Sequence, residues 1–143
     1  MDRGLAFALE LGRVTRRWRT RLNERVKHTG LTQARWITLL ALARRGPISQ
    51  RELADIIGVE GPTVVRLLDA LERQSIIERR ASTDDRRVKH IHLTKAARPL
   101  LREITRIADD VRDDVLADIS AADLKTAHRV LQQIADRLED PVA

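Results

Sequence analysis

Hydrophobic residues recur at intervals of three and four along most of the chain, the spacing of amphipathic α-helices. The first stripe runs from Leu11 to Val26 and stops at Gly30, and the second ends before Gly46-Pro47. Together these stripes predict six helices. They cover about 5–28 and 33–44, then Ser49 to Gly58, Pro62 past Leu71, the Thr94 cap through Ile119, and the Ser120 cap past Leu138.

Capping residues support several of these boundaries. Ser49 and Glu52 have the spacing of a capping box, and Ser120 with Asp123 repeats it with aspartate in place of glutamate. Pro99 conflicts with a regular start at Thr94, because proline removes a backbone donor. We expect Pro99 to delay or kink that helix.

The middle of the chain predicts a winged helix-turn-helix. Two short helices are joined by a glycine-containing turn, the arrangement of a helix-turn-helix. Strand-like segments from Ile76 to Arg80 and from Val88 to Leu93 then flank the turn 82–85, which indicates a β-hairpin. The expected fold class is therefore mainly α with a small β-hairpin, a winged helix-turn-helix with N- and C-terminal dimerisation helices.

Composition narrows the class of protein further. The 143 residues are 43 % hydrophobic and 34 % charged, which suits one compact domain. The sequence has no apolar run of membrane-spanning length and no secretory leader, so we expect no membrane partner and a cytoplasmic location. Because there is no cysteine, thiol catalysis and cysteine-based redox sensing are excluded.

Positive charge is concentrated near the N-terminus. Residues 1–50 carry eleven basic side chains against three acidic ones, whereas residues 100–143 carry six against ten. A basic half favours a polyanion such as nucleic acid, although the same balance also serves solubility.

Three long apolar stripes lie outside the winged segment and cannot all be covered by it. A monomer that folds these helices back is one solution, and a two-fold dimer is the simpler one. A dimer would also present two recognition helices about 34 Å apart, as successive major grooves require.

The helix that begins at Pro62 is the expected recognition helix, whose first turn meets base edges. Arg66 is the strongest candidate, because its planar guanidinium can bond O6 and N7 of guanine together. The alternative for Arg66 is an ion pair with Asp69 or Asp55. The predicted base contacts are Pro62, Thr63, Val65 and Arg66.

The hairpin tip is the expected wing. Arg86 and Arg87 suit a narrow minor groove, and Asp85 would support them by orienting an arginine. The alternative is a solvated charged turn. Backbone phosphates are expected to contact Thr32, Ser49, Gln50 and Arg51.

Nothing in the sequence supports catalysis, and no cofactor is expected. His90 and His92 lie on one side of a strand without an evident third metal ligand. A run of aspartates on the fifth helix could hold a divalent cation, although a solvated face is its ordinary interpretation. The run comprises Asp109, Asp110, Asp113 and Asp114.

These motifs resemble the MarR family of transcription regulators, and more closely its SlyA-like branch. The segments LTQARWITLLALAR, SQRELADIIGVEGPTVVRLLDALERQSIIERR and TDDRRVKHIHLT are similar to the family's second helix, helix-turn-helix and wing, in that order. Asp85 and Arg87 match its wing signature. The family usually has glycine where Ser75 stands, which is a departure here.

The resemblance implies a homodimer on a pseudo-palindromic operator, a transcriptional regulator that usually represses. It also implies a single domain over 1–143, with dimerisation regions 1–30 and 95–143 and a DNA-binding region 31–94. The alternative is a winged-helix protein-interaction module without specific DNA binding.

Family members often release DNA when a small aromatic acid binds between the dimerisation helices and the winged region. A pocket for such an aromatic carboxylate would place an arginine beside an aromatic face. The alternative is that both tryptophans belong to the core. The candidate pocket residues are Arg13, Arg17, Trp18 and Trp36.

Overall fold

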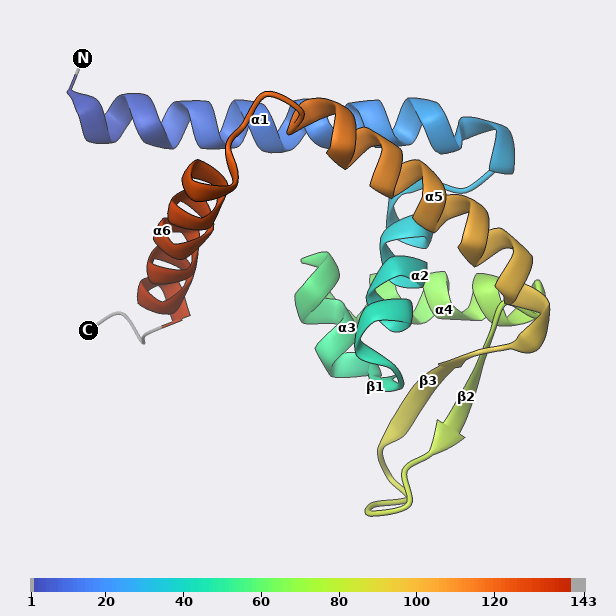
Figure 1. Ribbon diagram of the computed structural model, residues 1–143. Coiled ribbons are helices and arrows are strands. Elements are labelled where there is room, and N and C mark those ends of the chain that lie inside the picture. The colour runs from blue at the N-terminus through green and yellow to red at the C-terminus, as the bar shows by residue number, and fades with distance from the viewer. Residues whose placement is uncertain (1, 140–143) are drawn as a thin grey trace. The chain divides into compact units, whose positions relative to one another are not determined.

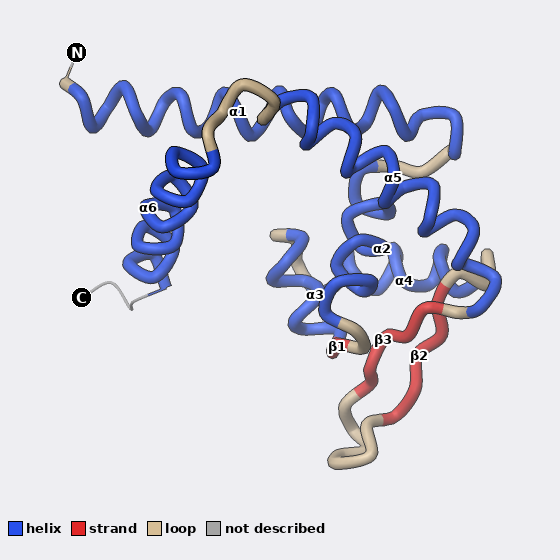
Figure 2. The backbone as a smooth tube through the Cα atoms, in the orientation of Figure 1, coloured by secondary structure: helices blue, strands red, loops and turns tan. Residues whose placement is uncertain are grey.

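A computed structural model describes residues 2–139, which form six α-helices, two short 3-10 helices and one small sheet (Figures 1 and 2). The mainly helical winged fold is as expected. The helices are α1 (Arg3–Val26), α2 (Gln33–Arg45), α3 (Gln50–Ile57), α4 (Gly61–Arg73), α5 (Arg98–Val115) and α6 (Ala121–Glu139). The strands are β1 (Ile48–Ser49), β2 (Ile77–Ala81) and β3 (Lys89–Leu93), and the 3-10 helices are η1 (Lys27–Thr29) and η2 (Lys95–Ala97).

The chain divides into two compact units. The first ends at Val111, within α5, and contains the winged helix-turn-helix together with α1. The second begins at Arg112 and contains α6. The more detailed division into dimerisation and DNA-binding regions stays a prediction.

The sheet has three strands where a two-stranded hairpin was expected. β3 lies in the centre, with β2 on one side and the two-residue β1 on the other, all antiparallel. Ile48 of β1 pairs with Ile91 of β3. Two residues are too few to show strand periodicity, and this pairing depends on a partner far along the chain.

One buried apolar core joins the helix-turn-helix to the wing. Its members are all fully or almost fully buried, and they come from α2, α3, α4 and every strand. Burial of aliphatic side chains is the main stabilising term in such a core. The core consists of Leu42, Ile48, Leu53, Val64, Leu68, Leu71, Ile77 and Ile91.

The start of α5 differs from the prediction. Thr94 makes no side-chain capping bond, and its hydroxyl instead donates to the carbonyl oxygens of Ser75 at 2.5 Å and Ile76 at 3.3 Å. The 3-10 helix η2 follows, and regular α-helix begins only at Arg98, with Pro99 in its first turn. Pro99 thus delays the helix, as expected, because proline fits best where no backbone donor is needed.

The end of α5 also differs, because Ile119 lies outside the helix. The helix ends at Val115, and the backbone bonds of Ala117 and Ile119 then go to residues three positions earlier. This tightening ends the α-helix. The next helix begins as predicted, with the Ser120 hydroxyl accepting a bond from the Asp123 amide at 3.1 Å.

The turn between α4 and β2 contains a residue in a left-handed conformation. Ser75 has a φ of 59°, and among the described residues it is the only one besides glycines with a positive φ. Its amide donates to Glu72, and its carbonyl accepts the Thr94 hydroxyl. A side chain strains this conformation, which explains why glycine suits the position better.

Replacing Ser75 with glycine should therefore stabilise the protein. We expect Ser75→Gly to raise the free energy of unfolding by about 0.5–1 kcal/mol. This is the difference between the backbone strain that glycine relieves and the entropy that glycine adds to the unfolded chain. Chemical denaturation measures the change. Ser75→Ala is the matched control and should give no gain, so an equal gain from both variants would contradict this explanation.

Candidate nucleic-acid interface

The helix-turn-helix is fixed by its caps. Ser49 accepts a bond from the Glu52 amide at 3.1 Å, and Glu52 accepts one from the Ser49 amide at 3.4 Å, so the predicted capping box is present. Gly58 ends α3 with a φ of 77°, a conformation that favours glycine. The turn then leads into α4 (Figure 1), which presents a bare N-terminal turn to solvent.

The N-terminal part of α4 has one buried face and one exposed face. Val64 and Leu68 are fully buried, whereas Gly61 and the four predicted base-contacting residues are exposed. This side of the helix is therefore free to approach a ligand, and its backbone donors favour a negatively charged one. The exposed residues are Pro62, Thr63, Val65 and Arg66.

Arg66 forms no hydrogen bond or ion pair with any other residue in the described range 2–139. The alternative ion pair with Asp69 or Asp55 is therefore not formed in that range. Asp69 is bound elsewhere, because its Oδ1 lies 2.6 Å from Nη2 of Arg79 on β2.

Arg79 also bonds Glu72, with its Nε 3.1 Å from Oε2, so one guanidinium joins two acidic residues of α4 to the wing. The hydrogen bond and charge of Arg79 lower the pKa of Glu72, although partial burial opposes this. The two carboxylates in turn raise the pKa of Arg79. Sequence reasoning missed this cluster, since it depends on the fold bringing β2 against α4.

The wing tip contains the arginine support that the sequence predicted. Asp85 accepts bonds from Nε and Nη2 of Arg87 at 3.3 and 3.4 Å, and from the Arg87 backbone amide at 3.0 Å. The Arg87 side chain is nevertheless 91 % exposed. Arg86 is also exposed. The tip thus presents two cations, one of them braced by a carboxylate.

The predicted phosphate-binding residues lie at the starts of two helices. The hydroxyls of Thr32 and Ser49 accept helix-capping bonds, so each still has its own proton to donate. Gln50 is half-buried and Arg51 is exposed in the first turn of α3. These positions leave backbone donors and hydroxyls available to an anion.

The four candidate effector residues do not come together in any of the grooves identified on α1–α2, α4 or α6. Trp36 is buried and donates its indole N–H to Asn23 at 2.6 Å, which agrees with the core alternative. Trp18 is half-buried. Arg13 pairs with Glu10 on the exposed face of α1.

An open groove of about 410 Å³ lies where α1 meets α2, and none of the candidate effector residues lines it. Arg17 is simply exposed on α1. The groove is lined by Asn23, Glu24, Lys27, Gly30, Leu31, Thr32 and Gln33.

The histidines of β3 face charged residues of β2. His92 lies opposite Glu78, and His90 opposite Arg80. Partial burial, with the positive charge of Arg80, lowers the pKa of His92. Within residues 2–139 no three potential metal-binding side chains come together, and no helix there has the length and apolarity to cross a membrane.

Comparison with known proteins agrees with this geometry. The MarR family profile matches residues 29–88. The transcriptional regulator PA3341 is 47 % identical, with a TM-score of 0.89 over 94 % of this chain and 99 % of that one.

Two more distant structures share the fold. A mutant MarR from E. coli, complexed with operator DNA, is 19 % identical with a TM-score of 0.74, over 90 % of this chain and 93 % of its own. Bordetella bronchiseptica BpsR, whose DNA binding is regulated by 6-hydroxynicotinic acid, is 20 % identical with a TM-score of 0.74, over 90 % and 92 %.

The similarity to PA3341 extends over nearly the full length of both chains, and the family profile matches the helix-turn-helix. The chain therefore belongs to the MarR family, whose members are DNA-binding transcriptional regulators and not enzymes.

Proposed function

We propose that the protein is a sequence-specific repressor that binds double-stranded DNA as a homodimer on a pseudo-palindromic operator. The first turn of α4 reads bases in a major groove, and the wing inserts Arg87 and Arg86 into the adjoining minor groove. One observation carries the proposal. Arg66 has no hydrogen-bonding or ionic partner within residues 2–139, and Arg87 is 91 % exposed and braced by Asp85. The first guanidinium lies on α4 and the second at the tip of the β2–β3 hairpin, and α4 shares one core with both strands.

Charge and chemistry support this division of labour. Arg66 can bond guanine in the major groove, whereas Thr63 and Val65 suit a hydroxyl contact and a thymine methyl. The capped starts of α2 and α3 suit phosphates, which fix the position of a protein on DNA without specifying sequence. The operator complex of E. coli MarR, which has the same fold, gives a precedent for DNA as the ligand.

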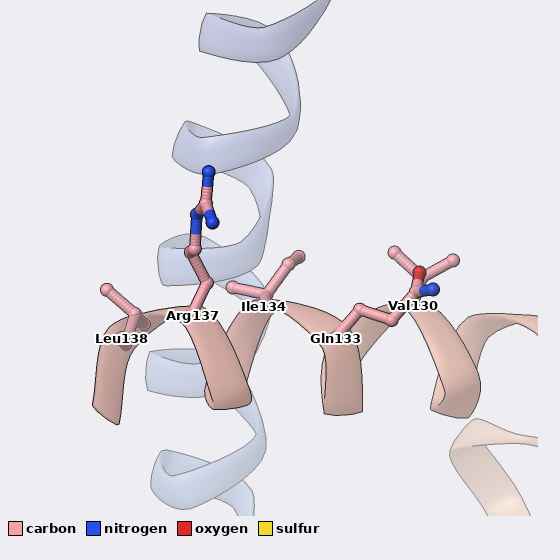
Figure 3. Close-up of a pocket in the computed structure, with 5 residues that line it drawn as sticks. All are labelled: Val130, Gln133, Ile134, Arg137 and Leu138. Carbon is pink, nitrogen blue, oxygen red and sulfur yellow. The ribbon is translucent and has the colours of Figure 1, made fainter. Parts of the chain in front are cut away.

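Dimerisation is supported by the apolar surface that each of the two units leaves uncovered by itself. No described residue of α6 is buried, and Leu138 is 78 % exposed. Val130, Ile134 and Arg137 project from one side of α6 around a shallow apolar pocket (Figure 3). In α1 the only buried residues are Leu22 and Val26, so the apolar stripe before them is also uncovered. Apolar helix faces of this length need a partner surface.

We further propose the finer features that the resemblance suggests, a SlyA-like subtype and a cytoplasmic location beside the DNA. A small aromatic carboxylate is the proposed effector that releases the operator. The regulation of BpsR by 6-hydroxynicotinic acid is a precedent for that ligand class. Arg17, which is exposed on α1 directly before the half-buried Trp18, is the proposed partner of the carboxylate, with Arg13 on the same helix.

Selection of duplexes from a random pool tests the proposal directly. We expect the protein to enrich a two-fold-related sequence and to bind it far more tightly than random DNA, with steep dependence on salt. A set of aromatic acids, added in parallel, tests release. Failure to prefer any duplex would instead favour a protein-interaction module.

Arg66 and Arg87 should affect binding differently. Arg66→Ala should cost about 1–3 kcal/mol at the selected duplex and relax the base preference at one position in each half-site. Arg87→Ala should weaken binding with less change in major-groove preference. Fluorescence anisotropy with base-substituted duplexes measures both. An equal loss on selected and random DNA from Arg66→Ala would contradict its assigned role.

A charge on the apolar face of α6 should break the dimer. We expect Leu131→Glu to give a monomer in analytical ultracentrifugation and to weaken operator binding at least tenfold, because one recognition helix then binds alone. Arg129→Glu places the same charge on the opposite side of the helix and is the control. If Leu131→Glu stays dimeric, α6 does not form the interface.

A further inference from the structure

The Arg79 cluster stands apart from the residues expected to touch DNA. Arg79 lies on β2, directly opposite the fully buried Ile91 of β3, so its side chain is on the face of the sheet that meets the core. It is only 23 % exposed, and it reaches Asp69 at 2.6 Å and Glu72 at 3.1 Å. Its guanidinium therefore binds α4 from the wing side.

Asp69 has a second possible partner. The half-buried Asp69 follows the exposed Arg66 by three residues along α4, a spacing at which oppositely charged side chains pair in isolated helices. Nevertheless Asp69 bonds Arg79, and Arg66 bonds no residue within 2–139. The competition between two arginines for one carboxylate is decided in favour of Arg79. Arg79 is held more firmly, because Glu72 fixes the same guanidinium through a second bond.

We propose that Arg79 is a positioning residue, which occupies Asp69 and so leaves the Arg66 guanidinium available for a base. This inference rests on the proposed DNA-binding function and adds a residue that never touches DNA. The raised pKa of Arg79 and the lowered pKa of Glu72 agree with a charged cluster that stays paired. Without Arg79, Asp69 would turn to Arg66 and compete with guanine.

Specificity, and not affinity alone, is the property that Arg79 should affect. We expect Arg79→Gln to lower the ratio of selected-duplex to random-duplex affinity by a factor of about 1.4 to 2.3 at low ionic strength, the extent to which an ion pair at this helical spacing masks Arg66. Arg73→Gln is the matched control. It removes the same charge beside the same cluster without freeing Asp69, so it should leave the ratio unchanged.

A second substitution separates release of Asp69 from general loss of structure. Arg79→Gln combined with Asp69→Asn should restore the ratio, because asparagine carries no charge to attract Arg66. Arg79→Gln combined with Glu72→Gln should not restore it. Equal rescue by both, or rescue by neither, would overturn the inference. So would an unchanged ratio in Arg79→Gln.

A readout without DNA keeps this inference separable from the proposed function. In nitrogen-15 NMR spectra of the free protein, the Arg66 Nε–H should exchange with water more slowly in Arg79→Gln, and at the wild-type rate once Asp69→Asn is added. Unchanged exchange overturns the inference even if the wild type binds a selected duplex. If the exchange rate of Arg66 changes as expected but the protein prefers no duplex, then Asp69 does switch from Arg79 to Arg66, and only the DNA-reading role of Arg66 is rejected.

Discussion

The packing of α4 against the sheet is the constraint on which the rest of the structure depends. Leu68 and Leu71 of the helix are fully buried in the same core as Ile77 and Ile91 of the strands. Because interiors are close-packed and resist deformation, the helix cannot rotate without moving the wing. Two surface elements, the first turn of α4 and the hairpin tip, are therefore held in a fixed relation, which is what the proposed binding of both to one duplex requires.

Polar contacts at the edge of this core complete the geometry. Thr94 holds the carbonyl oxygens of the α4–β2 turn, and Arg79 joins the middle of β2 to the C-terminal half of α4. Asp85 braces Arg87 at the tip. Each contact reduces the freedom of a group in or beside the proposed interface, and pre-organisation of this kind lowers the entropy lost on binding.

Local signals made most of the fold predictable from the sequence. Helical periodicity and capping residues such as Ser49 are patterns of only a few neighbouring residues, so they predict the helices and the winged fold class correctly. The third strand, the role of Thr94 and the partner of Asp69 could not be predicted in this way, because each depends on segments brought together only by folding. Within residues 2–139 Arg66 has no such partner, and the sequence could not show this either, because Asp69 is held by Arg79 from another element.

Directed cleavage of DNA tests the central claim, that α4 and the wing occupy adjoining grooves in each half of a dimer. The chain lacks cysteine, so Glu60→Cys beside α4 and Thr83→Cys in the wing each accept a single iron chelate. On a selected duplex we predict cleavage from position 60 at two major-groove sites about 34 Å apart, and from position 83 in the flanking minor grooves. Coincident cleavage from both positions, or cleavage spread evenly along the duplex, would contradict the account.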